Sequence, residues 1–283
     1  MKAGFVRAGI AVFWFLMVGW LVRYEAFPDR FTRSLAGYRG LLPEDVLVSD
    51  SWMKILFQDE PVGYARTVRD FDESGPVPRY TVHHNLHLRF RMAGIHREMQ
   101  ADAAVFLDLT RRLQRFTFRL ATRELSLGVE GRRARGEMFD VTVTTGPTVS
   151  QTRMRIPDDT ILFSPMQELG VSGLRPGQEL TLQILDPVTF ARTPVVVRAV
   201  RREPFVVGSS TVPATVLRSE YQGVTLHSWV DEEGSVLRQD TSLGWALRRC
   251  SPEEAVQAAQ AANLSTNVFR ALLPAPGPAG GET

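Results

Sequence analysis

The sequence predicts a mainly β protein. We expect a large curved antiparallel sheet, half-barrel or sandwich-like, with an N-terminal transmembrane helix and one short C-terminal helix. Three observations predict this. Apolar and polar residues alternate over most of residues 51–250, turn residues separate segments of strand length, and an uncharged apolar run stands near the amino terminus. Alternation gives each strand one dry and one wet face, which is typical of antiparallel sheet.

The amino terminus carries a membrane signal. Residues 8–22 read AGIAVFWFLMVGWLV, without a charge, between Arg7 and Arg23. No small-x-small cleavage site follows the run directly. We therefore expect residues 1–24 to be a cytoplasmic tip and an uncleaved signal anchor, rather than a cleaved signal peptide or a buried core helix. The expected partner of residues 8–22 is the inner membrane. Residues 25–50 lack periodicity and are expected to form a stalk or entry segment.

The body, residues 51–250, is expected to be one antiparallel domain of about ten to thirteen strands, a sheet large enough that it must curl or fold over. Residues 251–283 are expected to hold a short helix and then a disordered tail. Ser251, Pro252 and Glu254 match a capping box with proline at the first helical position.

Composition limits the function classes. The chain has 33 basic and 31 acidic residues and a formal net charge of +2, which argues against nucleic acid as a partner. A single cysteine excludes an internal disulfide and a multi-cysteine metal site. The sequence also lacks Walker, GxGxxG, GxSxG and HExxH motifs. We expect no cofactor, no metal and no catalytic residue; a hydrolase with an unfamiliar site is the weaker alternative.

Three histidines suggest a metal site. His83, His84 and His87 are close in sequence, and Glu98 or Asp102 could add a ligand. In a strand, however, His84 would face away from the other two histidines. Polar positions on a wet strand face account for the same residues, and this is the interpretation we favour.

The single cysteine, Cys250, is the only candidate thiol nucleophile. It stands beside Arg248 and Arg249 at the start of the expected helix, where positive charge would lower the pKa of the thiol. Nothing in the sequence connects it to His227, the one histidine of the C-terminal half. We expect a non-catalytic, partly buried thiol.

The segment SWMKILFQDEPVGYARTVRD, residues 51–70, resembles a hairpin of bacterial envelope proteins. Trp52 opens its first strand, residues 58–61 form a polar turn, and Val-Gly-Tyr at residues 62–64 opens the return strand. In that family the hairpin begins a β-rich, lipoprotein-like half-barrel region that precedes transglutaminase-like modules. The resemblance implies a membrane-anchored protein whose body lies on the periplasmic side and encloses a hydrophobic concavity.

The apolar face of the sheet is the candidate ligand site. A half-barrel would leave a groove on this face and a sandwich would fill it, and alternation allows both. We expect a non-catalytic envelope protein that binds a lipid-like ligand there. The alternative is a structural or assembly module whose partner is an envelope protein such as a transglutaminase-like enzyme. The candidate ligand-binding residues are Phe57, Tyr64, Tyr80, Leu86, Leu88, Phe90, Phe116, Phe118 and Leu120.

A basic segment includes the last three of these residues. Residues 111–135 contain eight arginines and two glutamates. Alternation places Arg115 and Arg119 on the face opposite the aromatic residues. Two interpretations of these arginines are open. They could contact anionic lipid headgroups, with a binding free energy of about 1 kcal/mol for each basic residue. Alternatively, they belong to a solvated face on which arginines pair with acidic neighbours.

Overall fold

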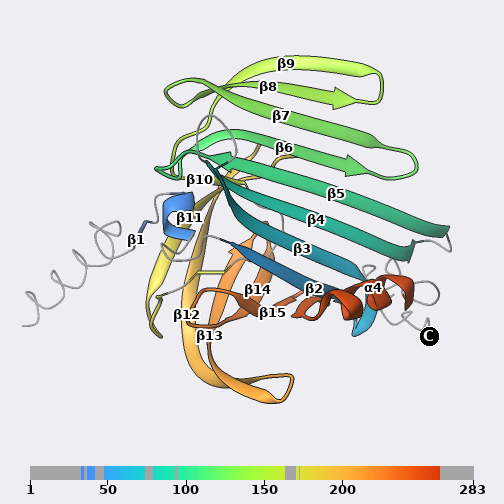
Figure 1. Cartoon of the computed structure of the whole chain (residues 1–283), viewed down its shortest axis with the longest axis vertical. Helices are drawn as coiled ribbons and strands as arrows, with labels where there is room; N and C mark the ends of the chain where they lie inside the picture. Colours follow the sequence, from blue (N-terminus) through green and yellow to red (C-terminus); the bar gives the residue numbers. More distant parts are fainter. Residues whose placement is uncertain are drawn as a thin grey trace, which may run out of the picture.

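The structure is a computed structural model that describes residues 33–34, 37–41, 48–73, 79–92, 95–162, 170–171 and 173–261. This part of the chain forms one large sheet and two short helices (Figure 1). In chain order the elements are β1 (Arg33–Ser34), α3 (Tyr38–Leu41), β2 (Ser49–Phe57), β3 (Glu60–Asp72), β4 (Arg79–Met92), β5 (Ile95–Leu107), β6 (Leu113–Ala121), β7 (Ser126–Arg135), β8 (Met138–Thr145), β9 (Thr148–Arg155), β10 (Thr160–Leu162), β11 (Glu179–Leu185), β12 (Arg192–Val207), β13 (Ser210–Tyr221), β14 (Val224–Val230), β15 (Val236–Thr241), β16 (Trp245–Arg249) and α4 (Pro252–Ala261).

The sheet consists of two antiparallel meanders. Strands β2 to β9 are neighbours in chain order, as are β11 to β16, and β16 pairs with β2 to join the two series. Among the described strands, β1 and β10 alone run parallel to their neighbour, β11. The predictions of a mainly β protein, a large antiparallel sheet and a short C-terminal helix are confirmed. Within the described residues the sheet has 16 strands, more than expected, and β1 and β10 are too short for alternation to reveal.

The strand registers separate an inner from an outer face. We call inner the face that carries Leu86 of β4, which lies between Ala65 of β3 and Ala101 of β5. The next residue, His87, lies between Tyr64 and Gln100 on the outer face. Because the side-chain period of a strand is two, one register assigns every side chain of these strands to a face.

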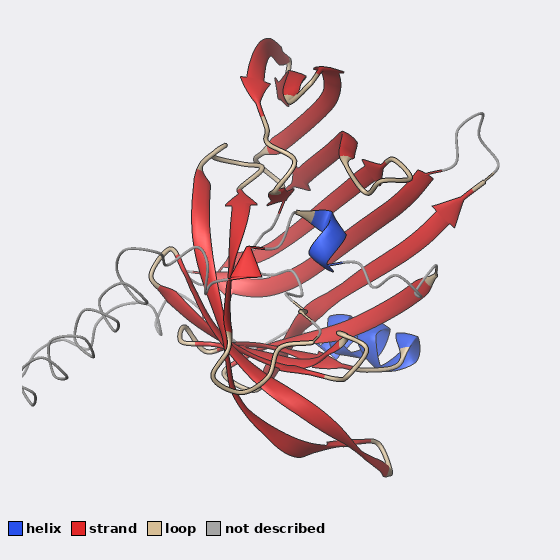
Figure 2. Cartoon of the chain, turned by 90° about the vertical axis from the view of Figure 1, so that its left-hand side faces the viewer, coloured by secondary structure: helices blue, strands red, loops and turns tan. Residues whose placement is uncertain are grey.

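The sheet curves until its two edges approach each other. Arg155 ends β9 at one end of the strand order, and Thr160 begins β10 at the other. Five residues of extended chain span at most about 18 Å, so the edges lie no farther apart than this at that point. In the described part β9 pairs with β8 only, so the sheet remains open. Figure 2 shows the curvature of the sheet from the side.

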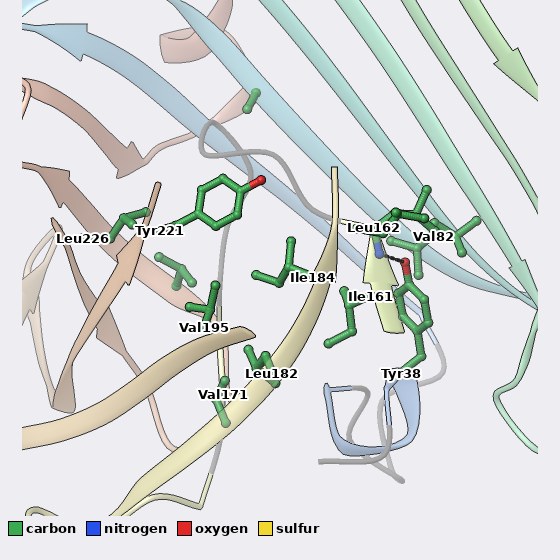
Figure 3. Packing of buried hydrophobic residues seen from close by; sticks show 14 of the residues in the cluster. Tyr38, Val82, Ile161, Leu162, Val171, Leu182, Ile184, Val195, Tyr221 and Leu226 are labelled. Carbon is green, nitrogen blue, oxygen red and sulfur yellow. Dashed lines mark hydrogen bonds between the residues drawn. The ribbon is translucent and has the colours of Figure 1, made fainter. Parts of the chain in front are cut away.

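Buried aliphatic side chains fill the space inside the curve. Leu182 and Ile184 of β11, Val195 of β12 and Leu226 of β14 are each no more than 1% exposed. Figure 3 shows them packed together, beside Tyr221 of β13. This part of the inner face is therefore a solid core rather than an open groove.

Part of the expected stalk packs against the body. Within residues 25–50 the structure describes β1, α3 and the start of β2. Tyr38 of α3 is 6% exposed, and its hydroxyl accepts a hydrogen bond from the backbone nitrogen of Leu162 at 3.0 Å (Figure 3). Burial raises the pKa of the Tyr38 phenol far above its ordinary value. This contact connects α3 to β10.

The hairpin of β2 and β3 has a two-residue turn. Gln58 and Asp59 have φ values of 50° and 66°, the pair of positive angles that suits the twist of a hairpin. Pro61, expected in the turn, lies in β3 beside a shift of register, where a missing N–H is tolerated. A Cβ at Gly63 would lie 1.9 Å from the carbonyl oxygen of His87, so only glycine allows this approach of β3 to β4.

The C-terminal helix begins with the predicted capping box. The backbone nitrogen of Glu254 donates to Ser251 Oγ at 3.2 Å, and the backbone nitrogen of Ser251 donates to Glu254 Oε2 at 3.0 Å. Helix α4 buries Ala255, Ala258 and Ala259 and contacts β2, β3 and β4.

None of the described helices has the length and apolar character that crossing a bilayer requires. The expected anchor, residues 8–22, and the expected tail after residue 261 lie outside the described residues.

Candidate functional site

An apolar pocket of about 190 Å³ lies on the inner face of β4, β5 and β6. Leu162 of β10 closes one side, and Pro187 and Val188, from the connection between β11 and β12, close another. The pocket is larger than the roughly 150 Å³ cavity that accommodates a benzene molecule in an apolar protein interior. Its lining residues are Val82, His84, Leu86, Met99, Ala101, Ala103, Ala104, Val105, Thr117, Phe118, Leu120, Leu162, Pro187 and Val188.

Two alanines create the hollow. Ala101 lies between Leu86 and Leu120, and Ala103 lies between His84 and Phe118, in neighbouring rows across the three strands. A methyl group at the centre of each row leaves space that larger neighbours surround. The sequence signal is present in the run ADAAV at residues 101–105, where small side chains occupy alternate positions. Alternation alone does not distinguish these small residues from the rest of the apolar face.

The connection that closes the pocket is held by one carboxylate. Asp186 Oδ1 accepts hydrogen bonds from the backbone nitrogens of Val188 at 2.7 Å and Thr189 at 3.2 Å. The carbonyl oxygen of Asp186 accepts another from the nitrogen of Phe190 at 2.9 Å. This side-chain-stabilised turn fixes the backbone of Pro187 and Val188 at the pocket.

His84 is the polar side chain of the pocket wall. It is 6% exposed, and its Nδ1 lies 3.0 Å from Oγ1 of Thr67, its neighbour across β3 and β4. Burial lowers the pKa of His84 to about 4, while the charge of nearby Asp102 opposes this shift less strongly. At neutral pH the imidazole is therefore uncharged.

Three of the predicted ligand residues line this pocket. Leu86, Phe118 and Leu120 come together around Ala101 and Ala103. The rest of the wall was not predicted, because Leu162, Pro187 and Val188 come from segments outside the strands that show clear alternation.

Other predicted ligand residues belong to the packed core. Phe57 and Leu88 are at most 1% exposed. Phe116 is fully buried, with its ring 6.3 Å from that of Phe139. Tyr80 is partly buried, with its ring 4.8 Å from that of Phe71.

Two predicted residues stand apart. Tyr64 lies on the outer face, contrary to the expectation, because Gly63 occupies the inward position of β3. There the Tyr64 ring stacks on His87 at 5.6 Å between centroids and also contacts Trp52. Phe90 belongs to β4 and pairs with Arg97 of β5, but its side chain lies outside the described part of the structure.

Arg115 and Arg119 lie on the face opposite the pocket, as predicted. The guanidinium group of Arg115 is 3.1 Å from Glu130 and lies over the ring of Phe106 at 5.5 Å. Arg119 pairs with Gly128 across β6 and β7 and is exposed. The pairing of Arg115 matches the solvated-face interpretation, and contact with lipid headgroups remains a prediction.

The three histidines do not converge. His83 makes an edge contact with Phe106, with centroids 5.9 Å apart, on the face opposite His84. His87 lies 3.8 Å from Glu98. Across the described ranges, no group of three or more histidine, cysteine or acidic residues has the geometry to hold a metal ion.

The pKa of Cys250 shifts opposite to the sequence-based expectation. Burial is the largest influence and raises the pKa of the thiol, and the charge of Glu254 raises it further. The sulfur lies 3.7 Å from the carbonyl oxygen of Trp52. A half-buried thiol held in this way is less reactive than an ordinary cysteine.

Comparisons with known proteins give a likeness at the level of structure. No family model matches the sequence, and no curated protein matches it either. Among solved structures, the chain is similar to a β-barrel-like protein of domain of unknown function DUF1849 from Brucella abortus. That similarity has a TM-score of 0.46 at 9% sequence identity and covers 72% of this chain and 96% of the other.

Proposed function

We propose that the protein is a non-catalytic binding protein that holds a hydrophobic, lipid-like ligand in the pocket on the inner face of β4–β6. The observation that carries the proposal is the hollow itself, which is surrounded mainly by apolar side chains from four strands (β4, β5, β6 and β10) and one connecting segment (between β11 and β12). Exclusion of water from a pocket of this size supplies binding free energy of about 25 cal/mol for each Å² of apolar surface buried.

The size of the pocket limits what it holds. A volume of about 190 Å³ is small for a whole membrane lipid, because pockets for drug-sized ligands usually span about 300–1,000 Å³. It suits one ring or one stretch of a single alkyl chain. The rest of a longer ligand would extend beyond the pocket.

The binding test uses the full-length protein and the fluorescent apolar probe N-phenyl-1-naphthylamine. Replacing Ala103→Phe fills the hollow, so we expect probe binding to weaken by about tenfold or more, the equivalent of roughly 1.4 kcal/mol. Ala121→Phe is the matched control, because Ala121 is exposed and pairs with Gln100 on the outer face. Equal probe binding by both variants, with both folded by circular dichroism, would contradict the proposal.

The proposed location is the periplasmic side of the inner membrane, with residues 8–22 as a single-pass anchor. The support is the uncharged run between Arg7 and Arg23 and the likeness of residues 51–70 to envelope proteins. Alkaline phosphatase fused to the C terminus is active only after export. We therefore expect activity from the full-length fusion and its loss when residues 1–24 are removed; equal activity of the two would disprove the anchor.

A further inference from the structure

Among the described residues, the inner wall of the pocket contains one hydrogen-bonding side chain. Of the described lining residues, Thr117 is the other polar one, but it pairs with Ala104 and Glu130 on the outer face. His84 lies in the inward row formed by Thr67, His84, Ala103 and Phe118. The described lining therefore offers a ligand an apolar surface with one polar side chain, His84.

One ring nitrogen of His84 is engaged and the other faces no described partner. Nδ1 is paired with Thr67 Oγ1 at 3.0 Å, and no hydrogen bond to Nε2 arises from the described residues. A neutral imidazole has one donor and one acceptor nitrogen, so the role that Thr67 takes at Nδ1 sets the role left to Nε2. Thr67 is 4% exposed and so holds the ring in place from within the sheet.

The charges around His84 argue against an ionised head group. Asp102, on the adjacent strand, is hydrogen-bonded to Asn85 at 2.5 Å on the outer face. Arg69 is the nearest inward cation of the neighbouring strand, where it pairs with Val82, but it is not among the residues that line the pocket. Transfer of a carboxylate from water into an apolar site without a paired cation is strongly unfavourable.

We propose that the pocket is selective for a single-chain lipid with an uncharged hydroxyl head group, which hydrogen-bonds to Nε2 of His84 while the chain occupies the hollow beside Ala101 and Ala103. This inference rests on the proposed function and adds the class of ligand. A hydroxyl group both donates and accepts, so it satisfies Nε2 in either tautomer. An alkane would leave this nitrogen without a partner, at the free-energy cost of a buried unsatisfied polar group.

The test compares 1-decanol with decanoate at pH 7.5, each displacing N-phenyl-1-naphthylamine from the full-length protein. We expect decanol to bind about tenfold more tightly than decanoate, because the carboxylate would have to leave water without a paired cation. His84→Leu should weaken decanol binding by about tenfold, calculated with the affinity of the probe measured separately for this variant. His84→Gln, which retains a hydrogen-bonding group, should recover part of the affinity.

Arg69→Gln is the matched control and should leave decanol binding unchanged. If decanoate binds more tightly than decanol and loses this advantage in Arg69→Gln, the head group lies at Arg69 and the inference is wrong. If both ligands displace the probe equally, in the wild type and in His84→Leu, the inference also fails while the proposed function stands. If the probe itself does not bind, the proposed function fails. Thermal unfolding of each variant establishes that it is folded.

Discussion

At the scale of single residues, His84 is the unusual position of the inner face. Its neighbours in the strand rows are Ala103 and Thr67, and Thr67 provides one hydrogen bond to the ring. Burial favours the neutral form of this histidine, because the charged ring would lose most of its hydration in apolar surroundings. The structure therefore links protonation of this residue to unfolding.

We expect this link to appear in the pH dependence of stability. The pKa of His84 is about 4 in the folded protein and 6.5 for an unperturbed histidine. Between these values the unfolded chain binds a proton that the folded protein does not, so the free energy of unfolding falls as the pH drops from 6.5 towards 4. Urea unfolding at about pH 7 and pH 4.5 should show a loss of roughly 2–3 kcal/mol that is absent from His84→Leu.

The comparison has an internal control. Above about pH 7.5 His84 is neutral in both the folded and the unfolded states, so the wild type and His84→Leu should show parallel stability curves there. The same difference between pH 7 and pH 4.5 in both proteins would mean that other groups, and not His84, account for the loss at acid pH.

At the scale of elements, the packing of β6 on β7 depends on a missing side chain. Gly131 of β7 pairs with Phe116 of β6 and with Val141 of β8 on the inner face. A Cβ at Gly131 would lie 2.1 Å from Cε1 of Phe116. The Phe116 ring is fully buried and occupies the volume that a side chain at residue 131 would need, so the ring could move aside only by displacing other residues of the core.

Gly131→Ala should therefore destabilise the protein by about 1–3 kcal/mol, the usual cost of overpacking a core. Gly128→Ala, in the same strand, is the matched control: its Cβ would meet Thr144 at an ordinary 3.7 Å. There the lower chain entropy of alanine should leave stability unchanged or slightly increased. Chemical denaturation of the three proteins measures the difference, and equal midpoints for the two variants would contradict this account.

At the scale of the whole molecule, the pocket depends on the curvature of the sheet. β4–β6 provide one wall, while Leu162, Pro187 and Val188 approach from the other edge of the sheet. The five-residue step from Arg155 to Thr160 brings that edge near. The hydrogen bond between Tyr38 and the backbone of Leu162 then fixes β10 to α3. A flat sheet with the same strands would have no enclosed site.

Much of the fold could be predicted from the sequence because the signals are local. Alternation in β4 and β6 predicted which face of the sheet carries Leu86 and Phe118. The start of α4 was predicted from Ser251 and Glu254, which are three residues apart in the sequence and hydrogen-bond to each other. The face of Tyr64 was missed, since Gly63 carries no side chain to show which position turns inward. The pKa direction of Cys250 was also missed, because burial outweighs the adjacent charges.

The sequence by itself determined that this chain forms antiparallel strands with one apolar face, since the two-residue period of a strand is visible in residues that are close in the sequence. Only the tertiary structure decided which apolar residues fill the core and which surround a hollow. Phe116 and Leu120 belong to one strand and one face, yet Phe116 is fully buried and Leu120 lines the pocket. The physical reason is that cavities depend on the volumes of side chains from distant segments, which meet only when the sheet curves.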